Sequence, residues 1–168
     1  MNRVSGDRVS GGWWLAATLA VCAVNCAPPP PSELIATGGA EIYGKLCSTC
    51  HAPDGRSLAT LAPPLAGHAV WMLEAGGRTH LIRIVLNGMS GPIEVSGRQY
   101  NGMMTPLRYL KDQQVADVLN FVLTSWGNDA LLPKDHQAFT PAEVLAARTP
   151  IASPKDIAAE RPRLQGTP

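Results

Sequence analysis

The stretch Cys47-Ser48-Thr49-Cys50-His51 constrains this chain more than any other part of it. Two thiols three positions apart, with a histidine directly after them, form the attachment pattern for a c-type haem. The thiols can add across the two vinyl groups of one porphyrin, while His51 reaches the iron from the proximal side. The motif therefore predicts one covalently attached haem c (heme c), with His51 as an iron ligand.

The composition is compatible with a cofactor of this size. With 168 residues and a net charge of +1, the chain lacks the basic character of a nucleic-acid-binding protein. Two Phe, four Trp and three Tyr are few for the core of such a chain, unless a large apolar cofactor supplies part of the interior. We expect no nucleic-acid partner and a core that is completed by the haem.

Residues 1–27 have the pattern of an export signal. Arg3 and Arg8 form a basic region, and the apolar run 13–24 that follows is short for a bilayer-spanning helix. Residues 28–36 begin with four prolines, which predicts an extended linker. We therefore expect a periplasmic protein, with haem attachment outside the cytoplasm.

Two further cysteines, Cys22 and Cys26, raise the possibility of a lipid anchor. The residues directly before them, Val21 and Asn25, are not the small residues normally found at that position. Anchoring is therefore not favoured, and the chain is expected to meet a membrane only if a lipid holds it there.

Three other kinds of site use a pair of cysteines at this spacing. A thioredoxin-like redox pair needs a neighbouring βαβ unit, and the chain shows no parallel-sheet pattern. A zinc site needs two more ligands, usually closely spaced, whereas His68, His80 and His136 are isolated. A structural disulfide is the third alternative. The Cys-x-x-Cys-His motif, together with the export signal, favours haem over all three.

Apolar residues recur at helical spacing in several segments. The predicted helices cover residues 39–46, 79–86, 112–126 and 141–148. The last of them follows a capping box at Thr140-Pro141-Ala142-Glu143. Ser96-Gly97 predicts a two-residue turn between short strands at 93–95 and 98–100.

The sequence also predicts two exposed arginines, a helix cap and a C-terminal tail. Arg78 and Arg83 are expected to face water, and Asp112 is expected to cap the third helix. Beyond Thr149 the chain is broken by prolines and mixed in charge, which predicts a tail.

The second iron ligand must come from a residue far along the chain, and a methionine or a second histidine would serve. Either residue type has a more ordinary role, in core packing for methionine or at the surface for histidine. The candidates are Met72, Met89, Met103, Met104, His68, His80 and His136.

One stretch resembles the distal loop of a known family. The chain reads Tyr100-Asn101-Gly102-Met103-Met104-Thr105-Pro106, then Leu110-Lys111-Asp112, and later Trp126-Gly127-Asn128. This pattern resembles the bacterial class I cytochromes c, over about residues 37–128. Their methionine lies six residues before the leucine, which selects Met104. Thr105 stands where the family usually has proline, so Met103 is the competing candidate.

The resemblance implies an all-α fold, with three to five helices around one covalent haem and a small hairpin before the distal methionine. It implies that the Pro63 carbonyl accepts the proton of the proximal imidazole and that Leu65 packs on the haem. It also implies that Gly39 and Tyr43 lie where the first helix crosses the last one, near Phe121.

The expected organisation is an export signal (1–27), a linker (28–36), a cytochrome domain (37–128) and an extension (129–168) with a short helix near 141–148. By the same resemblance, the protein is an electron carrier or a non-catalytic cytochrome subunit. Its donor would be a periplasmic quinoprotein or molybdenum dehydrogenase, and its acceptor an oxidase or another cytochrome. The alternative is a haem enzyme or gas sensor with a displaceable distal ligand.

Overall fold

The computed structural model describes residues 38–74 and 77–161. The predicted export signal, the possible lipid anchor and the linker lie outside these residues. Within the described ranges, no helix is long and apolar enough to cross a membrane.

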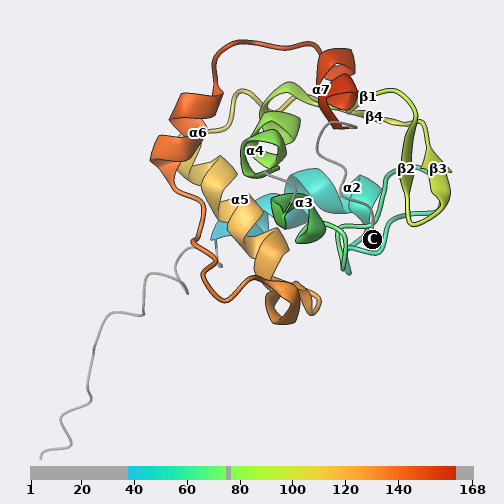
Figure 1. The fold of residues 1–168 in the computed structure, drawn as a ribbon, viewed down its shortest axis with the longest axis horizontal. Coiled ribbons are helices and arrows are strands. Elements are labelled where there is room, and N and C mark those ends of the chain that lie inside the picture. The colour runs from blue at the N-terminus through green and yellow to red at the C-terminus, as the bar shows by residue number, and fades with distance from the viewer. Residues whose placement is uncertain (1–37, 75–76, 162–168) are drawn as a thin grey trace, which may run out of the picture.

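Helices are the main secondary structure of the described chain (Figure 1). Helical residues 38–42 continue into the π-helical turn η1 (Tyr43–Cys47) and the short helix α2 (Ser48–His51). The remaining helical elements are α3 (Trp71–Glu74), α4 (Arg78–Asn87), α5 (Asp112–Thr124), the 3-10 turn η2 (Asn128–Leu131), α6 (Pro141–Ala147) and α7 (Pro154–Glu160). The expected all-α fold is confirmed.

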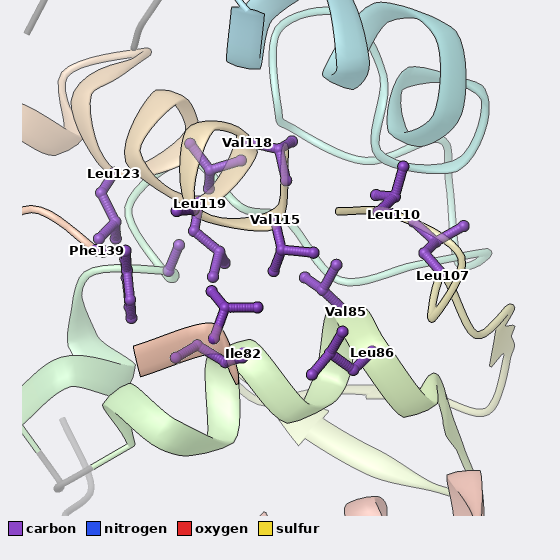
Figure 2. Packing of buried hydrophobic residues seen from close by; sticks show 14 of the residues in the cluster. Ile82, Val85, Leu86, Leu107, Leu110, Val115, Val118, Leu119, Leu123 and Phe139 are labelled. Atoms are coloured by element: carbon purple, nitrogen blue, oxygen red, sulfur yellow. The ribbon is translucent and has the colours of Figure 1, made fainter. Parts of the chain in front are cut away.

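The core lies between helices α4 and α5, whose apolar faces meet in Figure 2. The stripe predicted for α5 is buried, and it consists of Val115, Val118, Leu119 and Val122. Val115 and Leu119 of this stripe point toward a matching stripe on α4, formed by Ile82, Val85 and Leu86. Burial of these apolar side chains removes their surface from water, which stabilises the folded state.

In the described part of the chain, four short strands form two antiparallel pairs. Strand β2 (Ile93–Val95) pairs with β3 (Arg98–Tyr100) around Ser96 and Gly97, as predicted. Both turn residues have positive φ, 51° and 73°, as a two-residue hairpin of this kind requires. Strand β1 (Met89–Ser90) pairs with β4 (Met103–Met104), which brings Met104 next to the end of α4.

Two arginines of α4 that were expected to face water instead bind the C-terminal extension. The Arg78 guanidinium lies 4.1 Å from the centre of the Phe139 ring, and its Nη2 donates to Glu143 Oε2 at 3.0 Å. Arg83 Nη2 donates to Glu160 Oε1 at 2.7 Å. The expectation was wrong because the partners lie more than 60 residues away in sequence and leave no mark on the helical pattern.

Asp112 does not cap helix α5 as expected. Lys111 is the N-cap residue, and Asp112 is the first residue of the helix. Its Oδ1 accepts a hydrogen bond from Arg148 Nε at 2.6 Å. A carboxylate in the first turn still favours the helix, since the N-terminus carries a partial positive charge.

The segment beyond Thr149 is not the tail that was expected, because helix α7 forms there. Ser153 caps it, with its Oγ accepting from the backbone N of Asp156 at 3.2 Å, and Pro154 is the first helical residue. Ile157 is fully buried, and α7 packs against α4 and β1 (Figure 1). The signal was present in the sequence, as a capping box of the kind that correctly predicted α6.

Candidate functional site

His51 ends helix α2 with its ring buried and its Nδ1 3.0 Å from the carbonyl oxygen of Pro63. Because a carbonyl oxygen only accepts, Nδ1 must carry the proton and donate it, which leaves the lone pair on Nε2. Burial lowers the pKa of His51, and the hydrogen bond to Pro63 opposes this shift. The ring is therefore a neutral imidazole that can bind a metal through Nε2.

Cys47 and Cys50 carry free thiols on the same helical segment as His51. Residues at positions i, i+3 and i+4 share one helix face, so the two sulfurs and the imidazole are on the same side. Cys47 is half-buried and Cys50 is exposed. Burial, and then the nearby Cys50, raise the pKa of Cys47 to about 11, so its thiol is protonated at neutral pH.

The chain turns sharply after His51. Ala52 has a φ of 62°, and its carbonyl accepts a hydrogen bond from the Tyr43 hydroxyl at 2.6 Å. The backbone N of Ser57 then donates to the carbonyl of His51 at 3.1 Å. These bonds fold the following loop back over the end of α2, and that loop carries Pro63.

Three residues expected at the haem share one packing environment. The side chains of Cys47, Leu65 and Met104 are all partly buried and pack against the same core cluster. They come from η1, from the loop after His51 and from strand β4. The structure thus brings together residues that are separated by up to 57 positions in the sequence.

Met103 and Met104 differ clearly in their surroundings. Successive side chains of a strand point to opposite faces, so only one of the two can face the core. Met103 is 76% exposed, whereas Met104 is partly buried against the core cluster. Of the two methionines, Met104 is the one placed toward the interior.

Three of the other ligand candidates contact the C-terminal helix region instead. Arg161 donates to His68 Nε2 at 3.1 Å, and it also lies 3.7 Å from the sulfur of Met72. Burial, and then the charge of Arg161, lower the pKa of His68 to about 4. His80 is buried with its Nδ1 3.3 Å from a carboxylate oxygen of Glu160.

The two remaining candidates lie elsewhere in the described chain. Met89 packs against the small cluster of the β2–β3 hairpin. His136 is half-buried in the loop between η2 and α6.

The segment after His51 and the segment before Met104 together line a hollow of about 580 Å³. It is lined by Leu58, Ala59, Thr60 and Leu61 on one side and by Gln99, Asn101 and Gly102 on the other. Its volume falls in the range of about 300–1,000 Å³ that is typical of cofactor sites. Cys47, Cys50, His51 and Met104 do not line this hollow. The fit to a covalently attached haem therefore rests on the chemistry of the two thiols, the neutral imidazole nitrogen and the thioether.

Two polar groups that support this site were not anticipated. Tyr43 was expected only as a packing residue, and Asn128 only as part of a helix end. A hydrogen bond of the Tyr43 hydroxyl could have been predicted, because a buried tyrosine usually has a hydrogen-bond partner. Asn128 is fully buried, and no local pattern indicated which groups its amide would bind.

Comparison with known proteins gives consistent matches. Residues 36–126 match the family described as cytochrome c. The chain is 42% identical over 127 residues to cytochrome c-552 of Thermus thermophilus, which covers 75% of this chain and 95% of that protein.

Two longer proteins match over part of their length. The chain is 36% identical over 110 residues to the cytochrome c subunit of a quinone alcohol dehydrogenase from Gluconacetobacter polyoxogenes, covering 61% of this chain and 23% of that subunit. It is 42% identical over 96 residues to the cytochrome c subunit of gluconate 2-dehydrogenase from Pantoea cypripedii, covering 55% and 21% respectively.

Proposed function

The chain belongs to the cytochrome c family, and on this premise we propose that it is a periplasmic electron carrier whose iron is held between His51 and Met104. Its cofactor is one covalently attached haem c, and its role is electron transfer without a catalytic activity of its own. Its helical architecture is that of the class I members. The observation that carries the ligand assignment is the buried, neutral His51 ring, oriented by Pro63 and flanked by both thiols.

In this proposal Cys47 and Cys50 form the two thioether links, and Leu65 packs on the porphyrin. Pro63 keeps the His51 proton on Nδ1, so that Nε2 is the ligand on the proximal side. An iron with imidazole and thioether ligands passes single electrons at a higher potential than a bis-histidine iron. Met104 is preferred to Met103 because only Met104 packs toward the core.

We further propose that residues 1–27 are an export signal, 28–36 a linker, 37–128 the haem domain and 129–168 an extension, whose described residues 129–161 pack on that domain. The basic and apolar pattern of residues 1–27 supports export to the periplasm. Lipid anchoring through Cys22 or Cys26 is not favoured.

The redox partners are proposed from the surface around the haem site. Exposed apolar side chains lie before Cys47, along the hollow and beside Met104, and they are Leu46, Leu58, Leu61 and Met103. A net charge of +1 offers little long-range steering, so this face suits a brief, partly apolar contact. The relatives' names include cytochrome c subunits of a quinone alcohol dehydrogenase and a gluconate 2-dehydrogenase, which supports a dehydrogenase as the donor. We propose a periplasmic quinoprotein or molybdenum dehydrogenase as the donor, and an oxidase or another cytochrome as the acceptor, from the resemblance alone.

The ligand assignment is tested by spectroscopy of the purified protein. We expect an intact mass that includes one haem, a methionine-to-iron charge-transfer band in the ferric near-infrared spectrum, and no binding of carbon monoxide by the ferrous protein at neutral pH. Met104→Ala should abolish the band and admit carbon monoxide, whereas Met103→Ala should do neither. The reverse result would make Met103 the ligand. Ready carbon monoxide binding by the wild type would favour a haem enzyme or gas sensor.

The docking surface is tested by replacing one of its exposed side chains. Leu61→Glu should slow reduction of the cytochrome by a purified quinoprotein dehydrogenase, measured by stopped-flow absorbance. Leu145→Glu is the control, because Leu145 is similarly exposed at 62% but lies on α6. Equal rates for the two variants would contradict this assignment of the docking face.

A further inference from the structure

The side-chain amide of Asn128 joins helix α5 to the loop that carries Pro63. Its Oδ1 accepts from the backbone N of Gly67 at 2.7 Å, and its Nδ2 donates to the carbonyls of Leu65 at 3.2 Å and Val122 at 2.7 Å. Asn128 is fully buried, and both hydrogens of its amide are used. The loop two to four residues after Pro63 is thus tied directly to the end of α5.

The same segment also contacts the turn that follows His51. A Cβ built on Gly55 would lie 2.5 Å from the ring of Trp126, so this turn is pressed against the indole. The Gly55 carbonyl in turn accepts from the backbone N of Leu65 at 2.7 Å and of Ala66 at 3.0 Å. Trp126 and Asn128 therefore hold the two stretches of chain that carry the His51–Pro63 hydrogen bond.

An unusual backbone conformation places Asn128 in this position. Trp126 has a φ of 56° and Gly127 a φ of 84°, and together they turn the chain back beneath the end of α5. A positive φ is unfavourable for a bulky residue such as tryptophan. It is stabilised here by packing of the Trp126 ring on Tyr43 and Phe121, at centroid distances of 4.9 and 5.6 Å.

We propose that Asn128 is a positioning residue for the proximal iron ligand, acting through Pro63 on the His51 imidazole. This inference rests on the proposed function, in which His51 binds the iron. A hydrogen bond from Nδ1 makes the imidazole a stronger electron donor, which stabilises ferric iron. Loosening the Pro63 loop should weaken that bond and raise the reduction potential.

Asn120, on helix α5, provides a matched control. It is also a buried asparagine, with its Nδ2 donating to the carbonyl of Phe139 at 3.0 Å and its Oδ1 accepting from the Phe139 backbone N at 2.7 Å. It ties α5 to the C-terminal extension, whereas Asn128 ties α5 to the proximal loop. Replacing either residue by aspartate keeps the acceptor oxygen and removes the N–H donors.

The experiment compares the haem-loaded Asn128→Asp and Asn120→Asp proteins with the wild type. Both variants should be less stable, but only Asn128→Asp should raise the reduction potential. In the ferrous protein, NMR should show that the His51 Nδ1 proton of the variant exchanges with solvent about 10-fold faster or more. Local opening of the loop costs less free energy in the variant, because one or two hydrogen bonds are already missing. Asn128→Ser, which is smaller and uncharged, is the second variant if Asn128→Asp does not accumulate with haem.

Each outcome is decisive. If the Asn128 variants lose stability without a change in potential or proton exchange, or if Asn120→Asp changes both equally, the positioning role is overturned. If the wild-type His51 resonances are not those of an iron-bound imidazole, the proposed ligand assignment itself has failed, and the inference fails with it.

Discussion

Gly39 lies so close to Phe121 that a Cβ on the glycine would come within 2.7 Å of the Phe121 Cβ and 2.2 Å of the Asp117 carbonyl oxygen. The helical residues 38–51, which end with His51, therefore cross α5 at direct backbone contact. This crossing lies twelve residues before His51, at the other end of the segment that carries both thiols and the imidazole.

Gly39→Ala should destabilise the protein, because the added methyl group has no space at this crossing. Overpacking of this kind costs about 1–3 kcal/mol, which exceeds the gain of about 1 kcal/mol from replacing a helical glycine. Gly44→Ala is the control, since nothing lies within 4 Å of a Cβ at that position. Guanidinium unfolding of the haem-loaded proteins measures both, and equal stability of the two variants would contradict the close crossing.

Tyr43→Phe should leave the Ala52 carbonyl without its 2.6 Å hydrogen bond. Burial raises the pKa of Tyr43 to about 12, so the hydroxyl remains a donor throughout the neutral range. We expect a loss of about 1–2 kcal/mol, the cost of leaving a buried acceptor unsatisfied. Tyr109→Phe, at a site that is 69% exposed, should change the free energy of unfolding by less than about 0.5 kcal/mol. A similar small effect at both sites would show that water replaces the Tyr43 hydroxyl.

Glu143 should make the protein sensitive to acid. A hydrogen bond from Arg78 is the main cause that lowers the pKa of Glu143 from 4.5 to about 2. Since the pKa is lower in the folded state, the stabilisation is fully present above about pH 4.5 and is lost as the pH falls toward 2. The Glu143 side chain is 37% exposed, so solvent screening limits the contribution to about 1 kcal/mol.

The measurement is the difference in unfolding free energy between wild type and Glu143→Gln as a function of pH, since other titrating groups cancel in this difference. It should be largest near pH 6 and vanish near the folded-state pKa of about 2. The control is Glu41→Gln, because the Glu41–Lys45 pair is 68–70% exposed and should matter much less. A difference that is independent of pH would rule out the ion pair as its cause.

Ile157→Ala should show that helix α7 is part of the folded domain. Ile157 is fully buried, and removing its side chain should leave a cavity that costs about 2–5 kcal/mol. Ile151→Ala, in the same extension but at a site that is 72% exposed, should stay within about 0.5 kcal/mol of the wild type. Thermal unfolding followed by circular dichroism separates the two. An unchanged midpoint for Ile157→Ala would mean that α7 does not contribute to stability.

The sequence determined features that depend on neighbours a few residues apart. The spacing of Cys47, Cys50 and His51 places three ligating groups on one helix face, because the helical repeat brings i, i+3 and i+4 together. The α4 and α5 stripes, the β2–β3 turn and the α6 cap follow from equally local rules. Helix α7 had the same kind of cap, but prolines and mixed charge suggested a tail.

Contacts between distant segments were decided by the tertiary structure alone. The bond from Asn128 to Gly67 joins residues 61 positions apart, and the partners of Arg78 and Arg83 are farther still. Met103 and Met104 are adjacent and chemically identical, and they differ only because strand β4 turns one to solvent and the other to the core. Helical and turn patterns in a sequence depend on local backbone geometry. The partners of these side chains, and the burial of one methionine rather than the other, depend on which elements pack together.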